Sequence, residues 1–371
     1  METLSFVAIL EKDKHDSCNV SWIYPAVPQG YERVLLNRSN LHGQITSPLI
    51  YSRFADLWHY TYLFEIGDES EDFPDQNMLR FTKIVSISIG SKQFYPERYF
   101  PLLKMFGQIY LDNRGNPTEI LNCTLSLAFS GAITFKSKEI SPPPFEEQKK
   151  SLLKTPLTDV TSLFGVSSIF FWHALITRRS VLVKSNSTPA LLTLLRAFPL
   201  FVFHRQDWSI LHPFITASEL EIKDVISSTN QRPDAIQTHS TFPNGIVVGC
   251  TDPAVEALYP FDFVADMNEK TVVMRQASED RDDDSELMAG PVFETTPFHK
   301  EAATIMKKST NQKELVSKLN ALTQKLVERV EGLREEIGKK NPFTPNAVKE
   351  LLPDLPIATC RFLVDILHAE E

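Results

Sequence analysis

The chain has 371 residues and a formal net charge of −9, and 42% of its residues are hydrophobic and 10% aromatic. This composition excludes a globally disordered chain, because disordered chains contain few apolar and aromatic residues. The net negative charge argues against nucleic acid as the main partner, since phosphate binding requires a concentrated cationic surface.

Residues 1–131 predict an antiparallel sheet with helices on one side. Apolar and polar residues alternate in 83–89, which is typical of a strand, and Pro96 opens a helix whose apolar residues recur every three or four positions. The expected strands are 4–10, 20–24, 49–54, 59–66 and 83–89, and the expected helices are 32–39, 96–110 and 117–129.

Residues 132–155 predict a linker, because they combine the proline run 142–144 with the charged stretch 146–150. After the linker, helix and strand patterns alternate in 156–275, which indicates an α/β domain with a largely buried sheet. The expected helices are 158–164, 166–178 and 189–198, and the expected strands are 180–184, 208–215, 245–249, 261–266 and 271–274. We expect an acidic loop at 276–297 and a helical part at 298–371.

The four cysteines lie far apart in the sequence, so we expect no metal site. No phosphate-binding glycine loop, G-x-S-x-G or H-E-x-x-H motif occurs, and we therefore expect no cofactor and no catalytic residue. On an extended strand Asp262 and Asp266 would lie about 13 Å apart, too far for an acid/base pair, and Asp266 is expected to fix the following hairpin. His173, inside an apolar helix, is expected to be a core residue.

The first residues lack the basic flank and apolar core of a signal peptide. The longest apolar run, 163–176, is shorter than the roughly 20 residues that span a bilayer. We therefore expect a reduced cytoplasmic chain with no transmembrane segment and with peripheral membrane association at most.

Polar residues concentrate directly after the apolar run 198–203, at His204, Arg205, Gln206 and Asp207. One interpretation is a structural loop from which Trp208 enters the core. The other is an exposed recognition corner, because Arg and Trp are favoured where binding energy concentrates in interfaces.

The helix predicted at 311–338 begins with Asn311 as a cap and Glu314 as its reciprocal partner. Leucine, valine and isoleucine recur along it at steps of three and four and form one apolar stripe. Lys318 and Lys325 lie on the other side, and the helix could use these charges to contact a coiled-coil partner in addition to covering its own domain.

The chain resembles the DENN-domain family, in particular its small branch without appended domains. Four segments carry the resemblance: 159–164 (DVTSLF), 203–214 (FHRQDWSILHPF), 245–253 and 261–274. The family's Asp-Leu-Asp appears here as Asp266-Met267-Asn268, so no role carries over to Asn268. The resemblance implies a bilobal α/β module: a longin-like antiparallel sheet with helices, then a three-layer α/β lobe with a helical C-terminal extension.

The resemblance also implies guanine nucleotide exchange on a Rab-family small GTPase, with recruitment to late endosomes. The alternative that it implies is a non-catalytic adaptor that binds a coiled-coil scaffold in a Commander-type endosomal recycling assembly. The missing nucleophile motifs disfavour a hydrolase.

Overall fold

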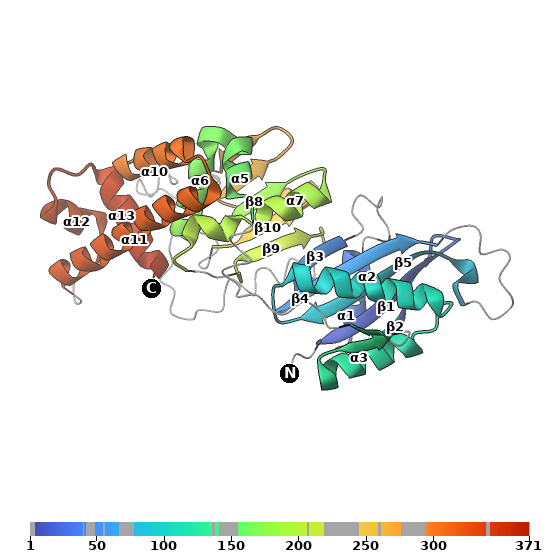
Figure 1. Ribbon diagram of the computed structural model, residues 1–371. Helices are drawn as coiled ribbons and strands as arrows, with labels where there is room; N and C mark the ends of the chain where they lie inside the picture. Colours follow the sequence, from blue (N-terminus) through green and yellow to red (C-terminus); the bar gives the residue numbers. More distant parts are fainter. Residues whose placement is uncertain are drawn as a thin grey trace. The chain divides into compact units, whose positions relative to one another are not determined.

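The structure is a computed structural model, and the chain forms two compact units, one mainly from residues 1–151 and the other mainly from residues 152–371 (Figure 1). Each unit is built on a five-stranded sheet, which confirms the predicted α/β class. The structure describes residues 4–39, 41, 49–54, 56–66, 78–135, 138–140, 155–205, 208–218, 245–258, 261–275, 294–338 and 342–370. The predicted acidic loop lies outside these residues for 276–293, as do 141–154 of the predicted linker.

The sheet of the first unit is antiparallel, with strand order β2-β1-β5-β4-β3. Its strands are β1 (Phe6–Asp13), β2 (Cys18–Tyr24), β3 (Leu49–Phe54), β4 (Leu57–Glu65) and β5 (Thr82–Ser91). The helices are α1 (Tyr31–Arg38), α2 (Pro96–Asp112) and α3 (Thr118–Ser130), with a 3₁₀ turn η2 (Met78–Phe81). All five predicted strands and all three predicted helices of this unit are present.

The core of the first unit forms because β1 and β5 lie in the middle of the sheet. Phe6, Ala8 and Leu10 project to one face of β1 and pack against α1, and the alternating Val7 and Ile9 are fully buried on the other face. The larger of these side chains, phenylalanine, leucine, valine and isoleucine, each contribute about 1.5–3 kcal/mol by burial. Gly90 in β5 leaves the room for this packing, because a Cβ there would lie 2.2 Å from the Phe6 ring.

The segment predicted as a linker contains a small two-stranded sheet of β6 (Ile133–Phe135) and β7 (Lys138–Ile140). The proline run and charged stretch of the following residues carried the linker prediction, and they gave no sign of this short hairpin. The exact domain boundaries at 131, 155, 275 and 297 stay predictions.

The sheet of the second unit has the strand order β12-β11-β8-β10-β9. Strands β10 and β11 pair with β8 in parallel, and β11 and β12 form an antiparallel hairpin. The bounds are β8 (Val181–Lys184), β9 (Leu211–Ile215), β10 (Val247–Cys250), β11 (Phe263–Asp266) and β12 (Thr271–Met274). Gly245, which leads into β10, has φ 56°, and a Cβ there would lie 2.5 Å from the backbone of Arg178.

The sheet of the second unit is accompanied by helices. They are α5 (Leu157–Phe164), α6 (Ser168–Ile176), α7 (Thr188–Leu195), α9 (Ala254–Ala257), α10 (Pro297–Lys308), α11 (Gln312–Ile337), α12 (Pro345–Leu351) and α13 (Ile357–Glu370). The predicted helices 158–164, 166–178, 189–198 and 311–338 are present with shifted boundaries, and the part expected to be helical at 298–371 is mostly helical where the structure describes it, whereas the pattern predicts no helix at 254–257. Two 3₁₀ turns are also present: η3 (Gly165–Ser167) includes two residues of the predicted helix 166–178, and η4 (Phe198–Val202) begins at the last residue of the predicted helix 189–198. Pro199 ends α7 early, since proline cannot donate a hydrogen bond within a helix.

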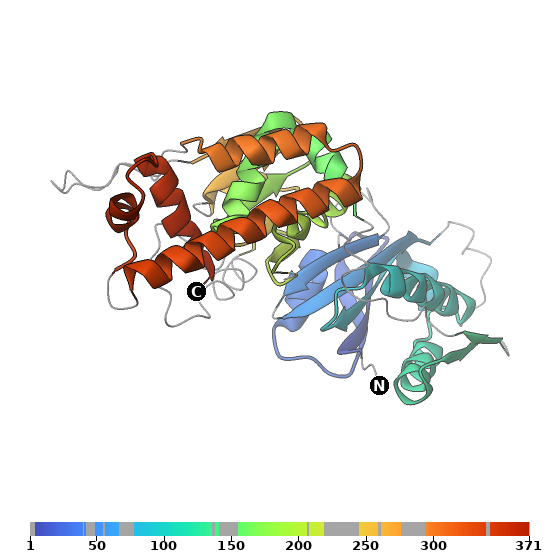
Figure 2. The ribbon, with the colours of Figure 1, turned by 60° about the vertical axis from the view of Figure 1, so that its left-hand side comes forward.

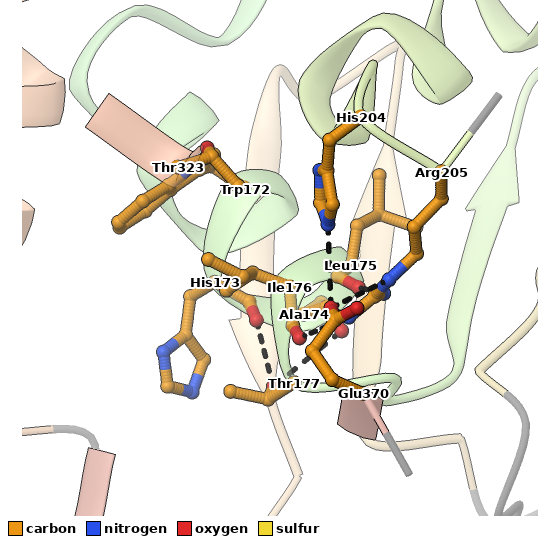
Figure 3. Close-up of polar contacts among 10 residues, drawn as sticks. All are labelled: Trp172, His173, Ala174, Leu175, Ile176, Thr177, His204, Arg205, Thr323 and Glu370. Carbon is orange, nitrogen blue, oxygen red and sulfur yellow. Dashed lines mark hydrogen bonds and ion pairs between the residues drawn. The ribbon is translucent and has the colours of Figure 1, made fainter. Parts of the chain in front are cut away.

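One helical stretch in the described part of the chain, Leu157–Ile176, is apolar and long enough to cross a membrane by length and composition alone. It is therefore longer than the apolar run 163–176 that the sequence pattern indicated. The stretch consists of α5, η3 and α6, and 56% of its most apolar window is buried. Trp172 within it is fully buried and donates a hydrogen bond to Thr323 Oγ1 at 3.0 Å (Figure 3). These contacts are compatible with a core helix.

Candidate functional site

His204 and Arg205, directly after η4, connect the end of η4 with the ends of α6 and α13 in the second unit (Figure 3). Arg205 Nη1 donates to the carbonyl oxygen of Leu175 at 2.6 Å, and Nη2 donates to that of Ile176 at 2.8 Å. The last carbonyls of a helix have no intrahelical partner, so the guanidinium satisfies the end of α6. Arg205 Nε donates to Glu370 Oε1 at 2.9 Å, which ties the end of α13 to the same point.

Glu370 is ionised in this arrangement of contacts. Burial alone would raise the pKa of its carboxyl, but the hydrogen bonds from His204 and Arg205 and their charges outweigh burial and lower the pKa to about 2. The carboxylate therefore accepts hydrogen bonds, and His204 Nε2 donates to Oε1 at 3.2 Å. We name Arg205, His204 and Glu370 with the end of α6 the C-terminal clamp.

The contacts of the C-terminal clamp correct the expectation that His204 and Arg205 lie at an exposed corner. The side chains of His204 and Arg205 are only 11% and 14% exposed and make contacts within the unit. Trp208 is 3% exposed, which confirms it as a core residue. Gln206 and Asp207 lie outside the described residues. The assignment of this segment to a partner surface stays a prediction, and for Arg205 the structure adds an internal role.

Helix α11 presents two different faces. Its apolar stripe is buried as predicted, and Asn311 caps it by accepting a hydrogen bond from Glu314 N at 2.9 Å. The reciprocal contact differs from the expected one, because the Glu314 carboxylate accepts from Thr310 N at 3.1 Å rather than from Asn311. Lys318 is 53% exposed and bonds Glu314 Oε1 at 2.6 Å, and Lys325 is exposed. The two lysines are therefore accessible, and their role as partner contacts stays a prediction.

A buried pair of histidines lies between α6 and α10. Thr296 N, which can only donate, bonds His299 Nδ1 at 3.0 Å, so the ring proton of His299 is on Nε2. That proton is donated to His173 Nδ1 at 3.0 Å. Both rings must be neutral for this chain to exist. His173 is thus a satisfied core residue, as expected.

The surroundings of the histidine pair favour the neutral rings. Burial, the neighbouring His299 and the charge of Arg179 hold the pKa of His173 well below its usual value. Burial lowers the pKa of His299 to about 4. No single position in the sequence signals the pair, because its members lie 126 residues apart.

The acidic residues around β11 are engaged in holding the sheet together. Asp266 Oδ1 accepts hydrogen bonds from the backbone N–H groups of Asn268 at 2.9 Å and Glu269 at 3.2 Å, which confirms that it fixes the hairpin. Asp262 Oδ2 accepts from the backbone and hydroxyl of Ser180, both at 2.7 Å. Neither carboxylate is arranged as one member of an acid/base pair.

A charge cluster lies where the parallel strands β8 and β11 end, the edge at which open α/β sheets commonly bind ligands. Lys184 Nζ contacts Glu256 Oε2 at 2.6 Å and Asp266 Oδ2 at 3.5 Å, and Arg275 also pairs with Glu256. Two cations and two carboxylates therefore neutralise one another. Within the described ranges no group of three or more histidine, cysteine or acidic residues could hold a metal ion.

The geometry thus defines an α/β protein of two units in which the polar clusters described above serve structure and the charges of α11 are accessible to a partner. A protein of Dictyostelium discoideum, DENN domain-containing protein 10, is 27% identical to the chain over 383 residues, which cover 98% of the chain and 96% of that relative. Proteins of the same name from Danio rerio and Homo sapiens are 26% and 25% identical, covering 69% and 58% of the chain and 67% and 59% of their own lengths. A comparison with protein-family models finds no match.

The similarity to proteins named DENN domain-containing protein 10, in one case over nearly the whole chain, supports a DENN-domain family. DENN-domain proteins are generally guanine nucleotide exchange factors for Rab GTPases. These relatives are all named DENN domain-containing protein 10, and the segments 159–164 and 203–214 carry the resemblance to the small branch of the family. The similarity to the Dictyostelium protein extends over both units.

Proposed function

We propose that the chain is a guanine nucleotide exchange factor for a Rab-family small GTPase in late endosomal and endocytic trafficking. It would act from the cytoplasm and be recruited to late endosomes. The observation that carries the proposal is the similarity to a DENN domain-containing protein 10 over 98% of the chain. Similarity across both units supports a function that uses the whole module rather than one lobe.

Nucleotide exchange requires differential binding and no covalent step. The exchange factor binds the nucleotide-free GTPase more tightly than the loaded one, and by linkage it weakens nucleotide binding by the same factor. A firm scaffold suits this task, because a GTPase without nucleotide has mobile switch segments. The internally paired Arg205, Asp262 and Lys184 give the second unit such a scaffold.

The first test is the preference of the chain for a nucleotide state. Each Rab of a panel is immobilised either loaded with GDP or stripped of nucleotide with EDTA, and binding of the full chain is measured. We expect at least one Rab to bind more tightly after stripping, and adding back GDP with Mg²⁺ should release the chain. Equal binding to both states across the panel would contradict the proposal.

A second candidate function is that of a non-catalytic adaptor in a Commander-type endosomal recycling assembly. The observation that favours it is α11, a helix of 26 residues whose outer side carries Lys318, Lys325, Glu328 and Glu331, charges that could meet a coiled-coil scaffold. An adaptor would bind its scaffold without changing the rate of GDP release from any Rab. Binding to the scaffold together with unchanged release would favour this function over exchange.

A further inference from the structure

The segment 297–327 has a charge opposite to that of the chain as a whole. It contains six lysines and two glutamates, whereas the full chain carries −9. The remaining residues of α11 return to a negative balance, with Glu328, Glu331, Glu335 and Glu336 against two arginines. The positive charge is therefore concentrated in α10 and the first part of α11. The lysines, which we name the lysine face, are Lys300, Lys307, Lys308, Lys313, Lys318 and Lys325.

The lysine face is exposed and largely uncompensated. All six side chains belong to exposed residues. Lys318 is paired with Glu314 at 2.6 Å, and the other five have no ion pair with any residue that the structure describes. Their charges are thus available to a partner.

The fold gathers the lysine face over two neighbouring helices. Helices α10 and α11 pack side by side and run in opposite directions, joined by residues 309–311 (Figure 2). The guanidinium of Arg329 lies 5.9 Å from the ring of Phe298, which fixes the far end of the pair. With a rise of 1.5 Å per residue, Lys318 lies about 7.5 Å along α11 from Lys313, and Lys325 about 10 Å further. The lysine face therefore extends about 20 Å from the turn.

Helix stability does not account for the whole lysine face. Lys307 and Lys308 end α10, where cations stabilise the helix dipole. Lys313, in the first turn of α11, faces the positive end of that dipole, which is unfavourable for the helix. Lys325 makes no ion pair with a described residue that would stabilise α11 in return.

We propose that the lysine face binds an anionic phospholipid bilayer and thereby holds the second unit at a membrane. A group of four to eight basic residues is sufficient for such attraction, and each contributes when it lies close to the lipid surface. A coiled-coil partner would follow α11 along its length and meet its acidic half. The lysines instead lie on two neighbouring helices, a distribution that suits a flat negative surface.

The proposal does not depend on nucleotide exchange, and its test uses no GTPase. The full chain is mixed with phosphatidylcholine vesicles that contain or lack phosphatidylserine, and bound protein is measured by co-sedimentation at several salt concentrations. We expect binding only to the vesicles with phosphatidylserine, with weaker binding as the salt concentration rises. The acidic segment 276–293 is kept in every variant, so its charge is constant.

The test variant is Lys308→Gln with Lys325→Gln, because neither lysine is paired within the described residues. Each neutralised lysine should weaken vesicle binding about fivefold, so the pair should weaken it about 25-fold. The matched control, Lys92→Gln with Lys104→Gln, removes the same charge from exposed positions of the first unit and should change binding less than about twofold. Lys308→Arg with Lys325→Arg should bind like the unchanged chain.

Three results would overturn the proposal. The first is equal binding to vesicles with and without phosphatidylserine. The second is an equal loss in the test and control variants, which would show that only net charge matters. The third is full vesicle binding by the Lys308→Gln, Lys325→Gln variant together with lost binding to a coiled-coil scaffold, which would assign the lysine face to a protein.

Discussion

The C-terminal clamp and the lysine face lie in the same unit. The sequence marks His204 and Arg205 of the clamp and Lys318 and Lys325 of the lysine face as candidate partner contacts. In the clamp, Arg205 is 14% exposed and bonds two carbonyl groups and a carboxylate of its own unit. In the lysine face, Lys318 is 53% exposed and Lys325 is exposed without an ion pair to a described residue. A cationic residue therefore indicates a partner surface only when residues of its own fold do not already provide its hydrogen bonds and ion pairs.

The largest effect is expected at Trp208, beside the clamp. Its side chain is 3% exposed, and loss of a buried tryptophan costs about 3–5 kcal/mol of unfolding free energy. Trp208→Ala should therefore lower the melting temperature clearly, and Trp208→Phe should lower it less because most of the apolar volume remains. Urea unfolding of both variants measures the difference. Equal stability of Trp208→Ala and the unchanged chain would show that this segment is not part of the core.

Arg205→Ala should be the next largest change, because the fold largely buries the guanidinium and pairs it within its own unit. It removes the donors to Leu175 and Ile176 and leaves Glu370 with His204 alone. Hydrogen bonds to charged groups contribute about 1.5–3 kcal/mol each, and partial exposure limits the total to about 2–3 kcal/mol.

A double-mutant cycle separates the clamp from a partner role. If Arg205 and Glu370 act together, Arg205→Ala and Glu370→Gln should couple by about 1–2 kcal/mol in unfolding free energy. Arg205→Lys should restore only part of the loss, because lysine lacks the planar fork. Unchanged melting of Arg205→Ala with weaker Rab binding would return Arg205 to the partner surface.

The histidine pair predicts a dependence of stability on pH that begins below about pH 6.5, whereas the lowered pKa of Glu370 in the clamp acts only at more acidic pH. The folded-state pKa values of His173 and His299 lie below the unfolded value, so their contribution is present above about pH 6.5 and is lost as the pH falls toward about 4. Between about pH 7 and about pH 5.5, unfolding free energy should fall by about 1 kcal/mol for His299. His299→Gln, whose side-chain oxygen can still accept the hydrogen bond from Thr296 N, should flatten this slope. An unchanged slope would mean that the pair does not titrate on unfolding.

The smallest effect on stability is expected in the lysine face. Lys318→Glu with Lys325→Glu should change the unfolding free energy by no more than about 0.5 kcal/mol per site, because exposed charges contribute little. The same variant should lose binding to phosphatidylserine vesicles. Thermal melting and co-sedimentation of one preparation measure both quantities. A loss of stability as large as that of Arg205→Ala would remove the contrast between the two regions.

Local patterns were sufficient to predict most of the fold. The alternation in 83–89, the proline at the start of α2 and the three-and-four spacing in α11 each reflect a face that must be buried, so they carry their own geometry. The clamp could not be predicted in this way, since Glu370 lies 165 residues from Arg205 and nothing nearby marks it as a partner. Contacts between helix ends depend on packing, and one sequence contains no local signal for them.

The rate of GDP release from a Rab measures directly whether the chain accelerates nucleotide exchange. Each Rab of a panel is loaded with fluorescent GDP, and release into excess GTP is followed with and without the full chain at substoichiometric concentration. We expect faster release from at least one Rab, with a rate that rises in proportion to the amount of chain. Unchanged release from every Rab, including any that the chain binds, would rule out nucleotide exchange and leave the adaptor function.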